Sequence, residues 1–406
     1  MDTPHNTQVV LRLDDPLELL AYLPYRLGFW PEESAVFFSL RACREQEGIR
    51  WDPGLVARVD LADLAHPDSG VRTDVRSTML GHLRNDGAEV VFLVLYTQEP
   101  VSRPAANPTT ATSAGVVTST GPAAPHGTGP PSGPAPSGAG PAAEVVRWWL
   151  DQGVAPDAAR IWVVSADTFR CLECRGEPCC PATGHPLSRI GDSRIGAEMV
   201  FRGMTYASSR AHVVQPARVD QQVRRDAVRA AARWRRRRVA GGPGRRTWLT
   251  GLARRWDQAL ADGVPVPALS PAELAALLVG LEEPLVRDAV LLSVATGTPA
   301  VRALNTDGTT LLDQVFGSGG PAPDQARMRR STEVLHLLTA VAARGRAAGA
   351  WAVLAWLAWF EGNGARADLC AAECLTLEPA HRLGELIRRA VVHGIPPGWA
   401  RVSPAA

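Results

Sequence analysis

Four of the seven cysteines stand close together in the stretch CLECRGEPCCPATGH, which also contains one histidine. A structural zinc ion takes four thiolate or imidazole ligands in tetrahedral geometry, and the cysteines commonly come in C-x2-C pairs. The spacing therefore permits a zinc knuckle, for which the candidate ligands are Cys171, Cys174, Cys179, Cys180 and His185.

The same stretch also fits a β-hairpin that uses its cysteines for packing. Neighbouring side chains of an extended chain point to opposite sides, so only one of Cys179 and Cys180 can readily face a common metal ion. Buried free cysteines behave as small apolar side chains. We expect the hairpin with buried thiols and no cofactor, and we keep zinc as the alternative.

A second candidate for chemistry is an arginine-rich segment. All 43 basic residues of the chain are arginines, and thirteen of them lie between Val213 and Leu260 beside only three aspartates. This excess of positive charge predicts either matching carboxylates elsewhere in the chain or a polyanionic partner. The candidates for contacts with nucleic-acid phosphates are Arg235, Arg236, Arg237 and Arg238. Because a chain without lysine builds every basic surface from arginine, we expect a solvated helix face and not a nucleic-acid partner.

Recognised catalytic motifs are absent from the sequence. It contains no G-x-x-x-x-G-K-[ST], no H-E-x-x-H, no G-x-S-x-G and no G-x-G-x-x-G after a strand. The sequence therefore indicates no catalytic residue, leaves the question of an enzyme open and favours a non-enzymatic protein.

The elements that would position these residues begin with an α/β pattern over residues 1–212. A capped amphipathic helix follows Asp15, and apolar strand patterns cover Ser34–Leu40, Glu89–Tyr96 and Ala159–Asp167. Continuous apolar runs are typical of strands covered on both faces, as in parallel sheets. The pattern therefore predicts a mostly parallel sheet.

Residues 101–142 interrupt this domain. They contain nine prolines, seven glycines and a single charged residue, Arg103. Such a composition buries too little apolar surface to offset its ordering entropy, so the segment is predicted to be disordered. The strand–helix–strand pattern resumes directly after it, which indicates an insertion within one domain.

Helical periodicity replaces the strand pattern from Val213 onward. We expect an arginine-rich helical connector over residues 213–260 and an all-α domain over residues 261–406. Residues 349–379 form a pattern similar to a tetratricopeptide-type helical hairpin, with small and aromatic packing positions and a Gly-Asn-Gly turn. The predicted fold class is therefore an α/β domain followed by an all-α domain.

Four stretches together resemble one bacterial family, the domain of unknown function DUF4192. They are DPLELLAYLPYRLGFWPEESAVFF, CCPATGHP, VRDAVL and LAWFEGNGARADLCAAECLTLEP, in that order. The resemblance covers roughly residues 8–98, 144–212 and 268–398. It implies the two-part architecture and a bacterial cytoplasmic protein, and it implies no activity, cofactor or catalytic residue.

We expect a cytoplasmic protein, because the first residues lack the layout of a secretory signal. The longest apolar run, Ala350–Phe360, is also far shorter than the ~20 residues of a membrane span. The preferred hypothesis is a regulatory or other non-enzymatic protein that binds another protein through its helical domain. One alternative is an enzyme with a ligand site at the carboxyl ends of the predicted strands. The other is a weak nucleic-acid binder that uses the arginine-rich segment.

Overall fold

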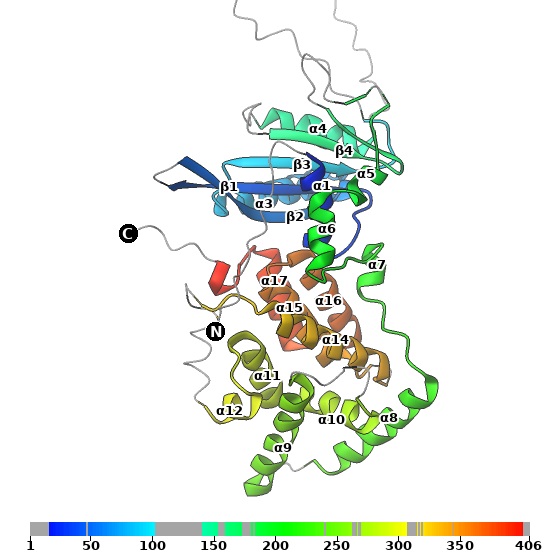
Figure 1. Cartoon of the computed structure of the whole chain (residues 1–406), viewed down its shortest axis with the longest axis vertical. Coiled ribbons are helices and arrows are strands. Elements are labelled where there is room, and N and C mark those ends of the chain that lie inside the picture. Colours follow the sequence, from blue (N-terminus) through cyan, green and yellow to red (C-terminus); the bar gives the residue numbers. More distant parts are fainter. Residues whose placement is uncertain are drawn as a thin grey trace, which may run out of the picture. The chain divides into compact units, whose positions relative to one another are not determined.

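The structure, a computed structural model, describes most of the chain (Figure 1). The described residues are 16–45, 48–101, 140–152, 159–172, 180–181, 183–238, 241–261, 266, 269–306, 315, 317, 320–343 and 345–400. Nearly the whole of the insert predicted to be disordered, residues 101–142, lies outside them, and so do Cys174 and Cys179 of the cysteine stretch.

The chain divides into two compact units. The first, called the sheet unit, is Glu32–Gly191, and the second, called the helical unit, combines Met1–Pro31 with Asp192–Ala406. Compactness alone does not show which segments fold independently, so the predicted boundaries at residues 212 and 260 stay predictions. The predicted combination of an α/β part and a helical carboxyl-terminal part is confirmed.

The sheet unit contains a six-stranded sheet of order β2-β1-β3-β4-β5-β6. Its strands are β1 (Ser34–Glu45), β2 (Gly48–Asp60), β3 (Val90–Tyr96), β4 (Ala159–Val164), β5 (Thr168–Cys171) and β6 (His185–Pro186). Its helices are α2 (Leu61–Leu64), α3 (Ser69–Asn85), α4 (Pro141–Asp151) and α5 (Ser188–Gly191).

The prediction of a mostly parallel sheet is wrong. Among the described strands β3 and β4 form the one parallel pair, joined through α4, and the other four pairs are antiparallel. Short links account for two of these antiparallel pairs, β1–β2 and β4–β5, because a parallel crossover needs a dozen or more residues. A continuous apolar run indicates that a strand is buried on both faces, as β1 and β3 are. It does not indicate the direction of the strand.

One face of this sheet forms the core of the unit with the helices. Apolar side chains that alternate along β1, β3 and β4 pack against α2, α3 and α4. Trp148 and Trp149 of α4 both contact the ring of Phe37, with centroid separations of 6.2 and 5.3 Å. The apolar stripe of α4 thus fixes the crossover between the two parallel strands.

The helical unit is built around one fully apolar helix. Its helices are α1 (Pro16–Leu27), α6 (Arg194–Phe201), α7 (Arg210–Val213), α8 (Gln221–Arg236), α9 (Gly242–Leu260), α10 (Pro271–Leu281), α11 (Pro284–Thr296), α12 (Ala300–Asn305), α14 (Gln325–Val341), α15 (Ala348–Phe360), α16 (Gly364–Leu377), α17 (Arg382–Val392) and the 3₁₀ turn η3 (Gly398–Ala400). All residues of α15 except Gly349 are buried. A helix that is apolar all round must be central, and α10, α11, α14, α16 and α17 pack against it (Figure 1).

Local sequence signals set several helix ends in this unit. Ser270 and Glu273 form a capping box at the start of α10, and Gly297 ends α11 in the left-handed region at φ 78°. Asn363 caps α16 by accepting a hydrogen bond from the Arg366 amide, so the predicted hairpin of α15 and α16 is present. No helix among the described residues has both the length and the apolarity needed to cross a membrane.

Candidate functional site

The cysteine stretch ends in the antiparallel pair of β5 and β6. The described part brings Cys171 and Cys180 together, with the Cys171 amide donating a hydrogen bond to Cys180 Sγ at 3.3 Å. His185 pairs with Phe169 across the two strands, and their rings stack at 5.2 Å. Cys174 and Cys179, the other candidate ligands, lie outside the described residues.

The environment of His185 bears on the zinc alternative. Its Nδ1 lies 2.8 Å from Arg189 Nη1, and because a guanidinium only donates, Nδ1 is the acceptor. With Nδ1 as the acceptor, the ring proton lies on Nε2. Zinc binding at Nε2 would displace that proton and also the hydrogen bond between Arg189 and Nδ1. Within the described residues no three His, Cys, Asp or Glu side chains form a group that could hold a metal ion. The absence of a cofactor stays a prediction.

The sheet edge proposed for a ligand contains the carboxyl ends of β3 and β4, but not that of β1. Because β1 is antiparallel to β3, its amino end at Ser34 pairs with Tyr96 instead. Glu33 has φ 39°, and its carboxylate accepts hydrogen bonds from Thr97 Oγ1 at 2.9 Å and the Gln98 amide at 3.0 Å. The Gln98 side chain in turn accepts one from the Ala166 amide at 3.1 Å. These polar groups therefore hold the strand ends to one another.

The arginine-rich segment, residues 213–260, contains α8 and α9. Arg235 makes an ion pair with Glu282 at 2.5 Å. Glu283, whose side chain is 2% exposed, accepts from Arg238 at 2.5 Å and from Arg245 at 2.9 Å. The matching carboxylates that the charge excess predicted are thus present for these three arginines. Of the four candidate phosphate ligands, Arg236, Arg237 and Arg238 are exposed, although Arg238 is paired with Glu283.

A charged cluster lies where α1 meets the turn between α15 and α16, so two stretches that carry the family resemblance come together. Arg366 Nη1 lies 3.7 Å from Glu361 Oε2. Burial raises the pKa of Glu361, and the positive charges of Arg366 and Arg26 oppose that rise. Gly28 adopts φ 82° directly beside Asn363. Sequence reasoning missed this cluster, although both of its stretches were recognised.

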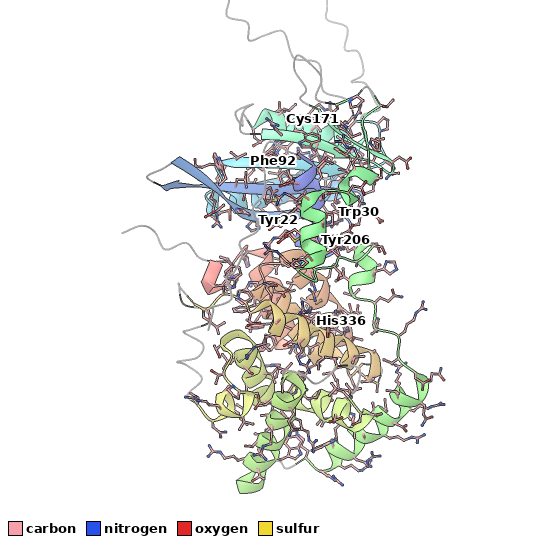
Figure 2. All side chains as sticks on the ribbon, viewed as in Figure 1. Tyr22, Trp30, Phe92, Cys171, Tyr206 and His336 are labelled. Carbon is pink, nitrogen blue, oxygen red and sulfur yellow. The ribbon has the colours of Figure 1, made fainter. Side chains whose placement is uncertain are left out.

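His336 lies on α14 in the helical unit (Figure 2). Its ring meets Trp351 edge to face with a centroid separation of 6.1 Å. Burial lowers the pKa of His336 to about 4, and the charge of Arg366 acts in the same direction. Burial also raises the pKa of the Cys370 thiol to about 11. A neutral imidazole and a protonated thiol at neutral pH indicate a packing role for both side chains.

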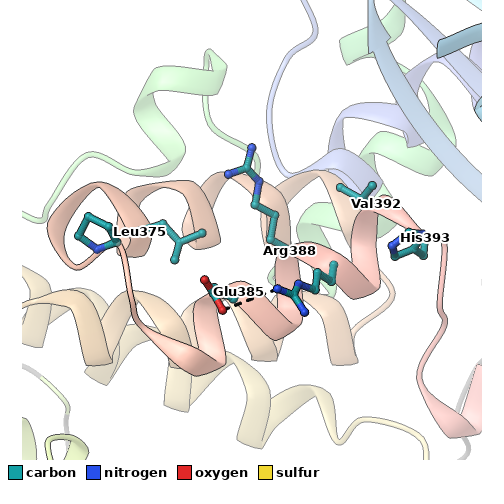
Figure 3. A pocket seen from close by; sticks show the side chains of 7 residues that line it. Leu375, Glu385, Arg388, Val392 and His393 are labelled. Atoms are coloured by element: carbon teal, nitrogen blue, oxygen red, sulfur yellow. Dashed lines mark ion pairs between the residues drawn. The ribbon is translucent and has the colours of Figure 1, made fainter. Parts of the chain in front are cut away.

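The candidate binding site is a groove between the end of α16 and the outer face of α17 (Figure 3). Its volume is about 480 Å³, and it is lined by Leu375, Pro379, Glu385, Arg388, Arg389, Val392 and His393. Four of these residues follow the helical spacing i, i+3, i+4 and i+7 along α17, so they share one face of the helix.

The inner face of α17 fixes this groove on the helical unit. His381 caps the helix, its Nδ1 accepting a hydrogen bond from the Gly384 amide at 3.3 Å. Leu383 and Ile387 are buried in the core, and an added Cβ on Gly384 would lie 3.0 Å from Cys374 Sγ. Close packing of α17 on α16 therefore presents a preformed groove.

The groove combines apolar surface with positive charge. Of the apolar residues that line the groove, Val392 is 52% exposed and Leu375 is partly exposed. Glu385 lies 4.0 Å from Arg389, whereas Arg388 has no ion pair within the described part of the chain. Such a groove can hold an apolar side chain against Val392 while Arg388 binds a carboxylate.

Sequence reasoning predicted a binding surface on the helical part but did not locate this groove. The available signal is the phase of the apolar residues in α17. Leu383, Ile387 and Val391 form the inner stripe, and Val392 lies on the opposite side of the helix. An apolar residue out of phase with the buried stripe is the sign of an exposed contact surface.

Comparison with known proteins gives a family and no function. Residues 16–398 match the model of a domain of unknown function, DUF4192, and the chain belongs to that family. No curated protein matches the chain, and no solved structure matches it. The resemblance seen in the sequence is thereby confirmed over nearly the whole chain.

Proposed function

We propose that the helical unit binds a partner protein in the cytoplasm, and that the α16–α17 groove holds a short segment of that partner. The observation that carries the proposal is the pairing of the partly exposed apolar side chains of Leu375 and Val392 with Arg388 in one preformed groove. Peptide-binding grooves on helical scaffolds combine apolar anchor positions with a few charged groups that set orientation.

The charges of the groove define the partner segment. A carboxylate of the segment would pair with Arg388, and Arg389 would reinforce it from the next position, although Glu385 partly neutralises Arg389. The side chain beside that carboxylate would be Leu, Ile or Phe, because Leu375 and Val392 offer apolar contact. The proposed ligand is therefore an acidic segment with one apolar anchor.

Peptide-display selection on the immobilised full chain tests the proposal. Selected peptides should carry Asp or Glu within a helical turn of a large apolar residue. In fluorescence anisotropy titrations, Arg388→Glu and Val392→Asp should each weaken binding of such a peptide at least about tenfold, a cost of about 1.4 kcal/mol.

Arg382→Glu provides the matched control, because Arg382 is exposed on the same helix but does not line the groove. This variant should bind the selected peptides like the wild type. Failure to enrich any peptide, or equal affinity of the Arg388 and Val392 variants and the wild type, would contradict the proposal.

A further inference from the structure

The outer face of α8 carries a row of exposed arginines that make no ion pair with Glu282 or Glu283. Arg225, Arg229, Arg233 and Arg236 are all exposed. At about 100° per residue these four positions fall within about 80° of arc, so they form one stripe along the helix. From first to last the stripe extends about 16 Å at the usual helical rise.

The opposite face of α8 fixes the direction of this stripe. Ala227, Ala230 and Ala231 are buried, and α8 packs on α10 and α14 within the helical unit. The arginine side chains therefore project away from the unit, from a helix at its periphery (Figure 1). Asp226, 3.7 Å from Arg229, is the sole acidic residue within α8.

We infer that the α8 stripe is a second binding surface, which contacts the phosphate backbone of duplex DNA without reading its sequence. Four guanidinium groups on one helix face match a polyanion with regularly spaced charges. Arginine contacts to phosphate position a protein on a duplex but carry no sequence information. This surface is separate from the α16–α17 groove and does not depend on it.

The chemistry of the stripe selects duplex DNA among polyanions. Single-stranded binders stack bases on aromatic side chains, and the outer face of α8 has none because Trp234 packs inward against the core. A helix fits within the wide major groove of B-DNA, where its arginines can reach the flanking phosphates, whereas the major groove of duplex RNA is too deep and narrow to admit a helix. A helix that lies on a membrane surface inserts apolar side chains, and those of α8 face the interior.

The stripe shares only Arg236 with the run of four arginines, residues 235–238, that the sequence singled out. Arg235 is held by Glu282, and Arg238 by Glu283. Arg236 belongs to the stripe although Arg235 beside it does not. These two neighbours therefore provide a matched pair for the experiment.

The experiment measures binding of the full chain to a fluorescent 24-base-pair duplex at several salt concentrations. The variant Arg225→Gln/Arg229→Gln/Arg233→Gln/Arg236→Gln should bind at least about tenfold more weakly in dilute salt. Its slope of log affinity against log salt should fall by about 3 to 4, since each phosphate contact contributes about 0.9.

A second quadruple variant controls for net charge. Arg84, Arg147, Arg160 and Arg302 are exposed and lie outside α8, so their replacement by Gln changes the net charge equally. This control should keep the wild-type salt slope. Equal weakening in both quadruple variants would overturn the inference.

Single variants keep the test valid if circular dichroism shows that the quadruple variant does not fold. Arg236→Gln should lower the slope by about one, and Arg235→Gln should leave it unchanged. Equal slopes for these two variants would overturn the inference. So would no binding of the wild type to the duplex, or tighter binding to duplex RNA, to single-stranded DNA or to phosphatidylserine vesicles.

Discussion

Gly28 lies against Asn363, so closely that a Cβ on Gly28 would approach Asn363 Nδ2 to 3.3 Å. Gly28 also adopts φ 82°, a region that side chains other than glycine rarely occupy. Asn363 caps α16, and therefore this contact joins the end of α1 to the start of the second hairpin helix. The stretches YRLGF and FEGNGARAD thus meet where Gly28 packs against the Asn363 side chain.

Gly28→Ala should consequently lower the free energy of unfolding by about 1–2 kcal/mol, from backbone strain and displacement of the Asn363 cap. Gly251→Ala is the control, because Gly251 lies within α9 and a Cβ there meets nothing within 4 Å. That substitution should stabilise the protein by about 0.5–1 kcal/mol. Urea denaturation measures both, and equal effects would contradict the argument.

The buried carboxylate of Glu283 should matter more than any surface ion pair. Glu283→Gln removes the charge that holds Arg238 and Arg245, and it should cost about 1–3 kcal/mol of unfolding free energy. Asp288→Asn is the comparison, because Asp288 is 55% exposed and pairs with its neighbour Arg287. That change should cost below about 0.5 kcal/mol. Similar losses for the two variants in urea denaturation would argue against a structural role of Glu283.

Apolar patterns in the sequence sufficed to locate β1, β3 and β4, α15 and the α15–α16 hairpin, because burial and helical period are local properties. They could not supply strand direction, which depends on short links and on pairing between distant residues. They also could not supply ion pairs such as Arg235 with Glu282, whose partners are 47 residues apart. The groove was missed for the same reason, since Leu375 and Arg388 come together only when α16 packs on α17.

Stability should fall on acidification through the pH range in which His336 titrates. Its pKa in the folded protein is about 4 against an ordinary value of 6.5. Between those values the unfolded chain binds a proton that the folded chain does not, so stability decreases by up to about 1.4 kcal/mol per pH unit as the pH is lowered. The stability that is linked to His336 is fully present above pH 6.5.

His336→Phe should remove this dependence while keeping an aromatic ring against Trp351. The difference in unfolding free energy between wild type and variant, measured in urea from pH 4.5 to 7.5, should therefore change by about 2–3 kcal/mol. Titration of Glu361 has the opposite effect on stability, because its raised pKa makes the folded state bind the extra proton as the pH is lowered. A flat difference for His336→Phe would contradict a neutral imidazole at His336 in the folded protein.

The cysteine stretch allows a final prediction about metal. If its thiols serve packing, protein purified without chelator should hold no stoichiometric zinc, and a chelator should leave the melting temperature unchanged. Cys180→Ser should cost about 1–3 kcal/mol, since it places a hydroxyl where Cys180 is 8% exposed. Cys171→Ser should cost less, because Cys171 is partly exposed. Elemental analysis decides between the two hypotheses: about one zinc per chain, lost with stability in both Cys171→Ser and His185→Ala, would show a metal site that displaces Arg189 from His185.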